Sequence, residues 1–139
     1  MIIIDATDMI AGRLATVVAK KALLGEKISI INAEKAILTG NKEWILKRFQ
    51  QKRNLGAPLI GPYFPKQSDR ILKRIIRGML PYKQAKGRTA FENIKCYVGV
   101  PEEFTGKEAS KIENASIEKL PNTKFVQIGE ISRLIGAKQ

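Results

Sequence analysis

The chain has 139 residues, of which 44% are hydrophobic and 27% are charged, and its formal net charge at pH 7 is +12. A domain of this size can bury about two thirds of the surface that its unfolded chain would expose, so the composition excludes a wholly disordered basic tail. One cysteine excludes an internal disulfide and a cysteine-rich zinc site, and the absence of histidine disfavours enzymes that need this base or metal ligand.

The start of the chain lacks the pattern of a signal peptide. Residues 2–4 are apolar, but no basic residue precedes them and Asp5 interrupts the run. The run is also far shorter than the roughly 20 apolar residues of a membrane-spanning helix. We therefore expect an intracellular, cytoplasmic protein that does not enter a membrane.

The first 40 residues predict a parallel crossover unit. Residues 2–4 form a short β-branched run, residues 11–24 are rich in Ala, Leu and Val, and residues 28–31 form a second β-branched run. Gly25 follows the middle segment and suits a helix C-cap. Strand, helix and strand at this spacing indicate the α/β class, and residues 36–38 predict a further short strand.

The next 40 residues predict two helices separated by a loop. Asn41 is a suitable N-cap for a helix over 42–53, which we expect Trp44, Ile45 and Phe49 to anchor. The Gly and Pro residues of 54–68 exclude a helix or a central strand there. Residues 69–80, between a predicted Ser68 cap and Pro81, form the clearest amphipathic helix.

That helix has an apolar half and a cationic half. At about 100° per residue, its aliphatic side chains cover one side, and Arg70, Lys73, Arg74 and Arg77 lie in the middle of the other. A basic turn over 83–88 and a short helical stretch should follow. Residues 94–99 then alternate as a strand, and beyond Pro101 only residues 129–135 predict another helix.

Positive charge is concentrated in the middle of the chain. Residues 41–90 carry thirteen Lys and Arg against two Asp and Glu, whereas residues 1–40 and 91–139 are nearly neutral. Such a block repels itself and normally needs a polyanion, which favours a nucleic acid over an acidic membrane or an acidic protein. The predicted RNA-binding residues are twelve of these cations and one exposed aromatic: Lys47, Arg48, Lys52, Arg53, Tyr63, Lys66, Arg70, Lys73, Arg74, Arg77, Lys83, Lys86 and Arg88.

Three other residues could carry chemistry, but each has a simpler interpretation. Asp5 and Asp8 follow a strand and suit a turn and a helix cap better than a metal or acid/base pair. Cys96, between Ile94 and Val98, suits a small core residue better than a reactive thiol. We therefore predict no catalytic residue, no metal site, no cofactor and no small-molecule substrate.

Several segments resemble a known family. The run Ile76-Arg77-Gly78-Met79-Leu80-Pro81, the pair Gly87-Arg88 and the run Ile94-Lys95-Cys96-Tyr97-Val98-Gly99 stand at the spacing of the signature of the thirteenth large-subunit ribosomal protein family. No residue departs from that signature over the 24 residues 76–99. Residues 5–7, 32–33, 39–42 and 61–63 extend the match over the first hundred residues, and Ser68-Asp69-Arg70 makes the form archaeal-type.

The resemblance implies a fold and a set of partners. It implies a three-layer α/β/α fold, Rossmann-like, with a mostly parallel four-stranded sheet. It also implies a structural constituent of the large ribosomal subunit that binds 23S-type ribosomal RNA early in assembly, beside other ribosomal proteins. We expect one domain over 1–139, with an RNA-binding block at 41–90 and a less specific extension at 100–139.

Two rival functions are weaker. An RNA-modifying or RNA-cleaving enzyme would need a nucleotide-binding loop or an acid/base set, and the sequence has neither. A DNA-binding module could use residues 69–80 as a recognition helix. Four cations without Asn, Gln or Ser on the outward face suit phosphates better than base edges.

Overall fold

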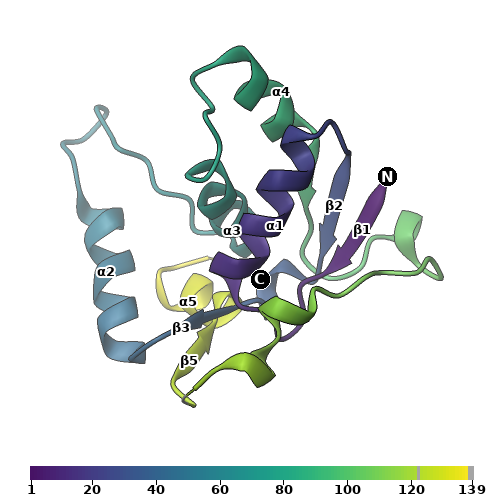
Figure 1. Cartoon of the computed structure of the whole chain (residues 1–139). Helices are drawn as coiled ribbons and strands as arrows, with labels where there is room; N and C mark the ends of the chain where they lie inside the picture. The colour runs from purple at the N-terminus through teal and green to yellow at the C-terminus, as the bar shows by residue number, and fades with distance from the viewer. Residues whose placement is uncertain (122, 138–139) are drawn as a thin grey trace.

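Strands and helices alternate over residues 2–54 in the computed structural model, which describes residues 1–121 and 123–137, and two further helices precede the next strand (Figure 1). The strands are β1 (Ile2–Asp5), β2 (Ile28–Ile31), β3 (Ile37–Thr39), β4 (Ile94–Cys96) and β5 (Phe125–Gln127). The helices are α1 (Ala11–Leu23), α2 (Lys42–Asn54), α3 (Ser68–Arg77), α4 (Ala85–Glu92) and α5 (Ile128–Leu134). Short 3₁₀ helices are η1 (Ala33–Lys35), η2 (Glu102–Phe104), η3 (Glu113–Ala115) and η4 (Ile117–Lys119).

The predicted crossover unit is confirmed. β1 and β2 pair in parallel with Ile4 opposite Ile30, and β4 joins β2 in parallel on its other side. α1 connects β1 to β2 and ends before Gly25, whose φ of +95° is the left-handed conformation that favours glycine at a helix C-cap. The α/β class that the sequence predicts is therefore correct.

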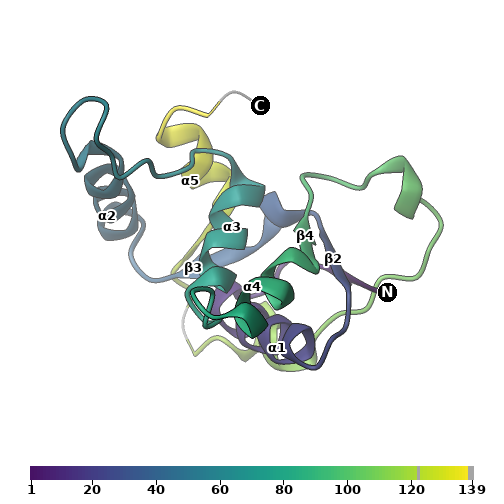
Figure 2. The same ribbon diagram turned by 90° about the horizontal axis from the view of Figure 1, so that it is seen from above.

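The two faces of the parallel sheet are covered differently. Ile4 and Ile30 point to the face on which α1, α3 and α4 pack, and they belong to the main core. Ile3 and Ile31 point to the opposite face and pack with Phe104 of η2 in a second, smaller cluster. Figure 2 shows the three helices on one side of the sheet and the loop that carries η2 on the other. A loop thus takes the place of the expected second helical layer.

The four-stranded, Rossmann-like sheet is not confirmed. Among the described residues the parallel sheet has three strands, and β3 pairs instead with β5 in a separate antiparallel sheet. Asn32, with a φ of +55°, turns the chain sharply after β2, so η1 and β3 leave the parallel sheet. At the outer edge of β1, the described residues form one isolated parallel bridge, between Ile4 and Ser110.

Two further boundaries differ from expectation. β4 ends at Cys96, and the side chain of Val98 is exposed instead of continuing the alternation of Ile94 and Cys96. β5 was not predicted, whereas α5 was expected over 129–135 and is found at nearly those positions.

In the part of the chain that the structure describes, no helix combines the length and the hydropathy needed to cross a bilayer.

Candidate nucleic-acid interface

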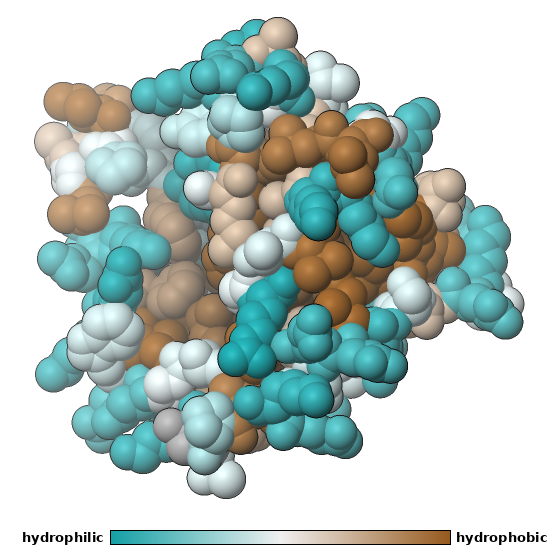
Figure 3. All heavy atoms as spheres, in the orientation of Figure 1, coloured by the Kyte–Doolittle hydropathy of each residue, from teal (hydrophilic) through white to brown (hydrophobic). Residues whose placement is uncertain are grey.

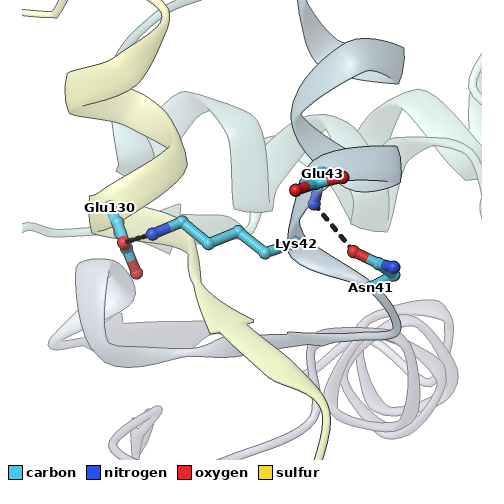
Figure 4. A network of polar contacts seen from close by, with 4 residues as sticks. All are labelled: Asn41, Lys42, Glu43 and Glu130. Carbon is cyan, nitrogen blue, oxygen red and sulfur yellow. Dashed lines mark hydrogen bonds and ion pairs between the residues drawn. The ribbon is translucent and has the colours of Figure 1, made fainter.

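α2 is held at its start by polar contacts and along its length by two buried side chains. The side chain of Asn41 accepts a hydrogen bond from the Glu43 backbone N–H, which confirms the predicted N-cap. The Lys42 ammonium forms an ion pair with Glu130 of α5 (Figure 4). Ile45 and Phe49 are buried as expected, but Trp44 is 59% exposed and does not anchor the helix.

Trp44 is exposed because α2 stands apart from the body of the protein. A groove of about 350 Å³ separates them, and Figure 3 shows hydrophobic side chains lining this hollow. Trp44 lies on the wall of the groove, with the Arg48 guanidinium carbon 5.5 Å from its ring centre. The cations of α2 are thereby carried outward on a projecting helix.

The loop between α2 and α3 has a fixed base and an exposed tip. Arg53 donates a hydrogen bond to the carbonyl oxygen of Phe64, and the Phe64 ring packs edge-on against Phe49 at 5.6 Å. The Ser132 hydroxyl donates to the carbonyl oxygen of Lys66. At the tip, Leu59 is 95% exposed. The residues that return to α3 are therefore held against α2 and α5.

α3 shows the predicted division into two faces but is shorter than predicted. Ile71, Leu72 and Ile76 are buried, and the four cations are on the other side, with Arg70 exposed and the rest partly buried. The helix ends at Arg77, because the N–H groups of Met79 and Leu80 bond in tighter turns to residues 76 and 77. Ser68 is its first residue, not its cap, and Met79 is exposed.

The cations of α3 lie over aromatic rings contributed by neighbouring segments. The Lys73 nitrogen is 4.6 Å from the ring centre of Phe91 in α4. Arg74 lies over Phe64 at 5.4 Å and Arg77 lies over Tyr82 at 4.8 Å. Such contacts hold a cation in place without neutralising its charge.

Like charges crowd this surface. Burial and the neighbouring cations Arg48 and Arg74 lower the pKa of Lys52. Burial and Arg77 likewise lower the pKa of Arg74, although Tyr82 acts in the opposite direction. In both cases the surrounding protein disfavours the charged form of the side chain. A bound polyanion would favour the charged forms of Lys52 and Arg74 and would relieve the repulsion between them.

The segment after α3 differs from the predicted basic turn. α4 begins at Ala85, so Lys86 and Arg88 are helical residues, and only Lys83 lies in the turn. A Cβ at Gly87 would lie 2.0 Å from the carbonyl oxygen of Pro81, so this close approach requires glycine. The side chains of Lys83, Lys86 and Arg88 are exposed.

The thirteen predicted RNA-binding residues are brought together only in part. Tyr63, Arg70, Lys73, Arg74 and Arg77 line one groove. Lys52 joins Arg74 over Phe64, with its nitrogen 5.2 Å from the ring centre. The other seven do not line that groove: Arg48 lies over Trp44, Lys47 is exposed on α2, Arg53 bonds to the loop, Lys66 lies beside Gly136, and Lys83, Lys86 and Arg88 are exposed at or just before the start of α4.

The sequence reasoning missed several residues at this surface. Lys95 lines a second small groove together with Arg70 and Lys73. Its exposure could have been predicted, since Lys95 alternates with Ile94 and Cys96 in β4. Phe91 and Tyr82 support cations of α3, but they come from other segments, and no local pattern in the sequence indicates those pairs.

The other candidate chemical groups have structural roles. Asp5 Oδ1 accepts hydrogen bonds from Thr7 and from the Asn32 side chain, which confirms the predicted turn. Asp8 caps no helix: its φ is +57°, and Ile10 occupies the N-cap position of α1. Cys96 packs against the core, and burial raises the pKa of its thiol to about 12. Within residues 1–121 and 123–137, no three acidic, Cys or His side chains gather to hold a metal ion.

Known proteins resemble this chain over nearly its whole length. The model of the family described as "Ribosomal protein L13" matches residues 1–103. A protein from Methanosarcina barkeri named "Large ribosomal subunit protein uL13" is 49% identical over 139 residues, which cover 99% of each chain. Proteins of the same name from Methanocaldococcus jannaschii and Methanococcoides burtonii are 49% and 47% identical, again over 99% of each chain.

Proposed function

The chain belongs to the ribosomal protein L13 family, and from this membership we propose that it is a structural constituent of the large ribosomal subunit. It binds large-subunit ribosomal RNA, takes part in early subunit assembly and is not an enzyme. Its partners are that RNA and neighbouring large-subunit ribosomal proteins. Its location is the ribosome in the cytoplasm, in the archaeal-type form that its relatives share.

One observation carries the RNA-binding part of this proposal. The face of α3 presents Arg70, Lys73, Arg74 and Arg77, and no acidic residue lines the groove beside them. In the described part of the chain, none of these four cations forms a salt bridge. Arginine and lysine held in this way neutralise phosphates without reading sequence.

The whole predicted set of RNA-binding residues remains part of the proposal. Residues 41–90 supply the binding block, and α2 and α4 extend the surface on either side of α3. We propose that residues 1–139 act as one domain and that residues 109–111 form the fourth strand of the expected sheet. The parallel bridge of Ser110 with Ile4 supports that strand.

The rival DNA-binding function fits α3 poorly. A recognition helix needs a free face that can enter a major groove. α3 has ten residues, and three of its four outward cations lie over Phe91, Phe64 and Tyr82. Cations held against the protein in this way suit contacts to the phosphate backbone of a nucleic acid that passes over them.

Two double charge reversals test the proposal. Changing Arg74 and Arg77 to Glu alters the net charge by as much as changing Lys111 and Lys119 to Glu. We expect the first variant to lose affinity for ribosomal RNA on the order of 100-fold, because two charge-assisted contacts are replaced by repulsion. We expect the second variant to bind nearly as the unchanged protein does.

The measurements are RNA affinity by filter binding and incorporation into large subunits in cells. Circular dichroism checks that both variants fold, since Ile71, Leu72 and Ile76 are untouched. Similar losses in the two variants would show nonspecific attraction. Normal binding by the α3 variant would exclude this helix as the principal contact.

A further inference from the structure

The groove beside α3 combines a cavity, positive charge and an available aromatic ring. Its volume is about 490 Å³, within the range of about 300–1,000 Å³ typical of small-ligand sites. It is lined by loop residues, by the cations of α3 and by one residue of α4: Tyr63, Phe64, Pro65, Arg70, Lys73, Arg74, Arg77 and Phe91. Four of these residues are cations and none is acidic, so the groove suits an anion with a flat apolar part.

Tyr63 differs from the other rings of the groove. Phe64 contacts Phe49 and lies under Lys52 and Arg74, and Phe91 lies under Lys73. Tyr63 is 68% exposed, and in the described part of the chain it contacts neither another ring nor a cation. It is therefore the ring of this groove that remains available for a planar group from a partner.

The Tyr63 ring lies close to the backbone of its own loop. A Cβ at Gly61 would lie 3.1 Å from two carbon atoms of that ring, closer than ordinary van der Waals contact. The ring thus packs against the backbone of its own loop at a residue without a side chain. On the α3 side, the stem of the loop is fixed by the Arg53 and Ser132 hydrogen bonds. These bonds keep Tyr63 beside the cations of α3, where a base and its phosphate can be bound together.

We propose that this groove binds one unpaired nucleotide of the RNA, with its base stacked on Tyr63 and its phosphate among Arg70, Arg74 and Arg77. This inference rests on the proposed RNA-binding function and specifies the RNA feature that this surface recognises. A regular duplex keeps its bases stacked inside and would contact the cations alone. An unpaired base can leave the helix and reach an aromatic ring, as is usual where proteins bind irregular RNA.

Three synthetic RNAs separate the base from the phosphate. The first is a fully paired duplex, the second has one unpaired adenosine in the same duplex, and the third has an abasic nucleotide at that position. Stacking of one base on an aromatic ring is worth a factor of about 5 to 150 in affinity. We expect the full-length protein to bind the adenosine bulge more tightly than the other two RNAs by such a factor.

Two variants at one position identify the ring. Tyr63→Leu keeps an apolar side chain but removes the ring, so the ratio between the affinities for the adenosine bulge and for the paired duplex should fall to about one in this variant. Tyr63→Phe keeps the ring, so the preference should remain. Because the side chain is largely exposed, both variants should fold.

The outcomes distinguish this inference from the proposed function. Equal binding of all three RNAs by the unchanged protein would overturn the inference and leave the basic surface intact. Preference retained by Tyr63→Leu would overturn the role of this groove. Failure to bind any of the three RNAs would overturn both proposals.

Discussion

Asp5 shows how one residue joins two strands at the carboxyl edge of the sheet. It ends β1, and its carboxylate accepts hydrogen bonds from Thr7 and from Asn32, which follows β2. Burial alone would raise the pKa of Asp5, but these hydrogen bonds outweigh it and hold the pKa below its ordinary value of 3.8. The carboxylate therefore stabilises the fold in its charged form.

The sign of this effect gives a prediction for pH. Because the folded pKa lies below the unfolded one, the stabilisation is complete above about pH 4 and is lost as the pH falls through the folded pKa. Asp5→Asn should lower the free energy of unfolding at pH 7 by roughly 1 kcal/mol, since neutral hydrogen bonds replace charge-assisted ones. Urea unfolding of both proteins at pH 7 and pH 2.5 measures this.

The difference in the free energy of unfolding between the unchanged protein and Asp5→Asn should be smaller at pH 2.5 than at pH 7. An equal difference in the free energy of unfolding at both pH values would show that the amide of Asn simply fits less well than the carboxylate. Asp8→Asn is the matched control, because that carboxylate is exposed and accepts none of these bonds. It should leave the stability nearly unchanged at both pH values.

At the scale of elements, the sequence predicted what depends on neighbouring residues. The periodicity of 11–24 and of 69–80 located α1 and α3, and Asn41 located the start of α2. Prediction from the sequence failed where contacts between distant segments determine the structure. β5 has three residues and forms only because β3 lies beside it, and Trp44 is exposed because α2 projects from the body. The same limit applies to the Phe91 and Tyr82 rings under the cations.

The loop between α2 and α3 should be the most mobile element. In the isolated protein at moderate salt, we expect the amides of β1, β2 and β4 to exchange hydrogen slowly, because they pair in the sheet and border the core. Residues 55–62 should exchange fastest, and the part near Phe64 and Lys66 should be intermediate. Hydrogen exchange read by mass spectrometry measures all three.

Strands that exchange as fast as residues 55–62 would contradict a preformed domain. The protein would then fold only on its RNA. Repeating the measurement with bound RNA should slow exchange in the loop far more than in the strands. That difference would locate the contact without any substitution.

At the scale of the whole molecule, charge and packing follow different divisions of the chain. Residues 41–90 hold nearly all of the excess positive charge, as the sequence shows directly. The main core, however, combines residues from Ile4 to Ile131. The less specific extension expected at 100–139 supplies Ala115, Val126, Ile128 and Ile131 to that core. Its weak periodicity concealed this role, because a 3₁₀ helix, a three-residue strand and a seven-residue helix carry these side chains.

The excess charge predicts a strong dependence on salt. If about six to ten phosphates are neutralised, the affinity for a ribosomal RNA fragment should fall about 10³- to 10⁵-fold between roughly 50 and 200 mM salt. The Arg74→Glu, Arg77→Glu variant should show a slope smaller by about two, one for each lost phosphate contact. A nearly flat dependence would mean that packing or base contacts dominate.

The place of α5 in the chain has a consequence for the order of events during synthesis. Ile128 and Ile131 complete the core, Glu130 is paired with Lys42 at the start of α2, and Ser132 holds the end of the loop before α3. Translation produces α5 after every other helix and strand. A growing chain therefore carries its cationic segments before the contacts that α5 makes to Lys42 and Lys66 exist. The proposed RNA surface is complete only when α5, the last of the described helices, has been released from the ribosome that makes it.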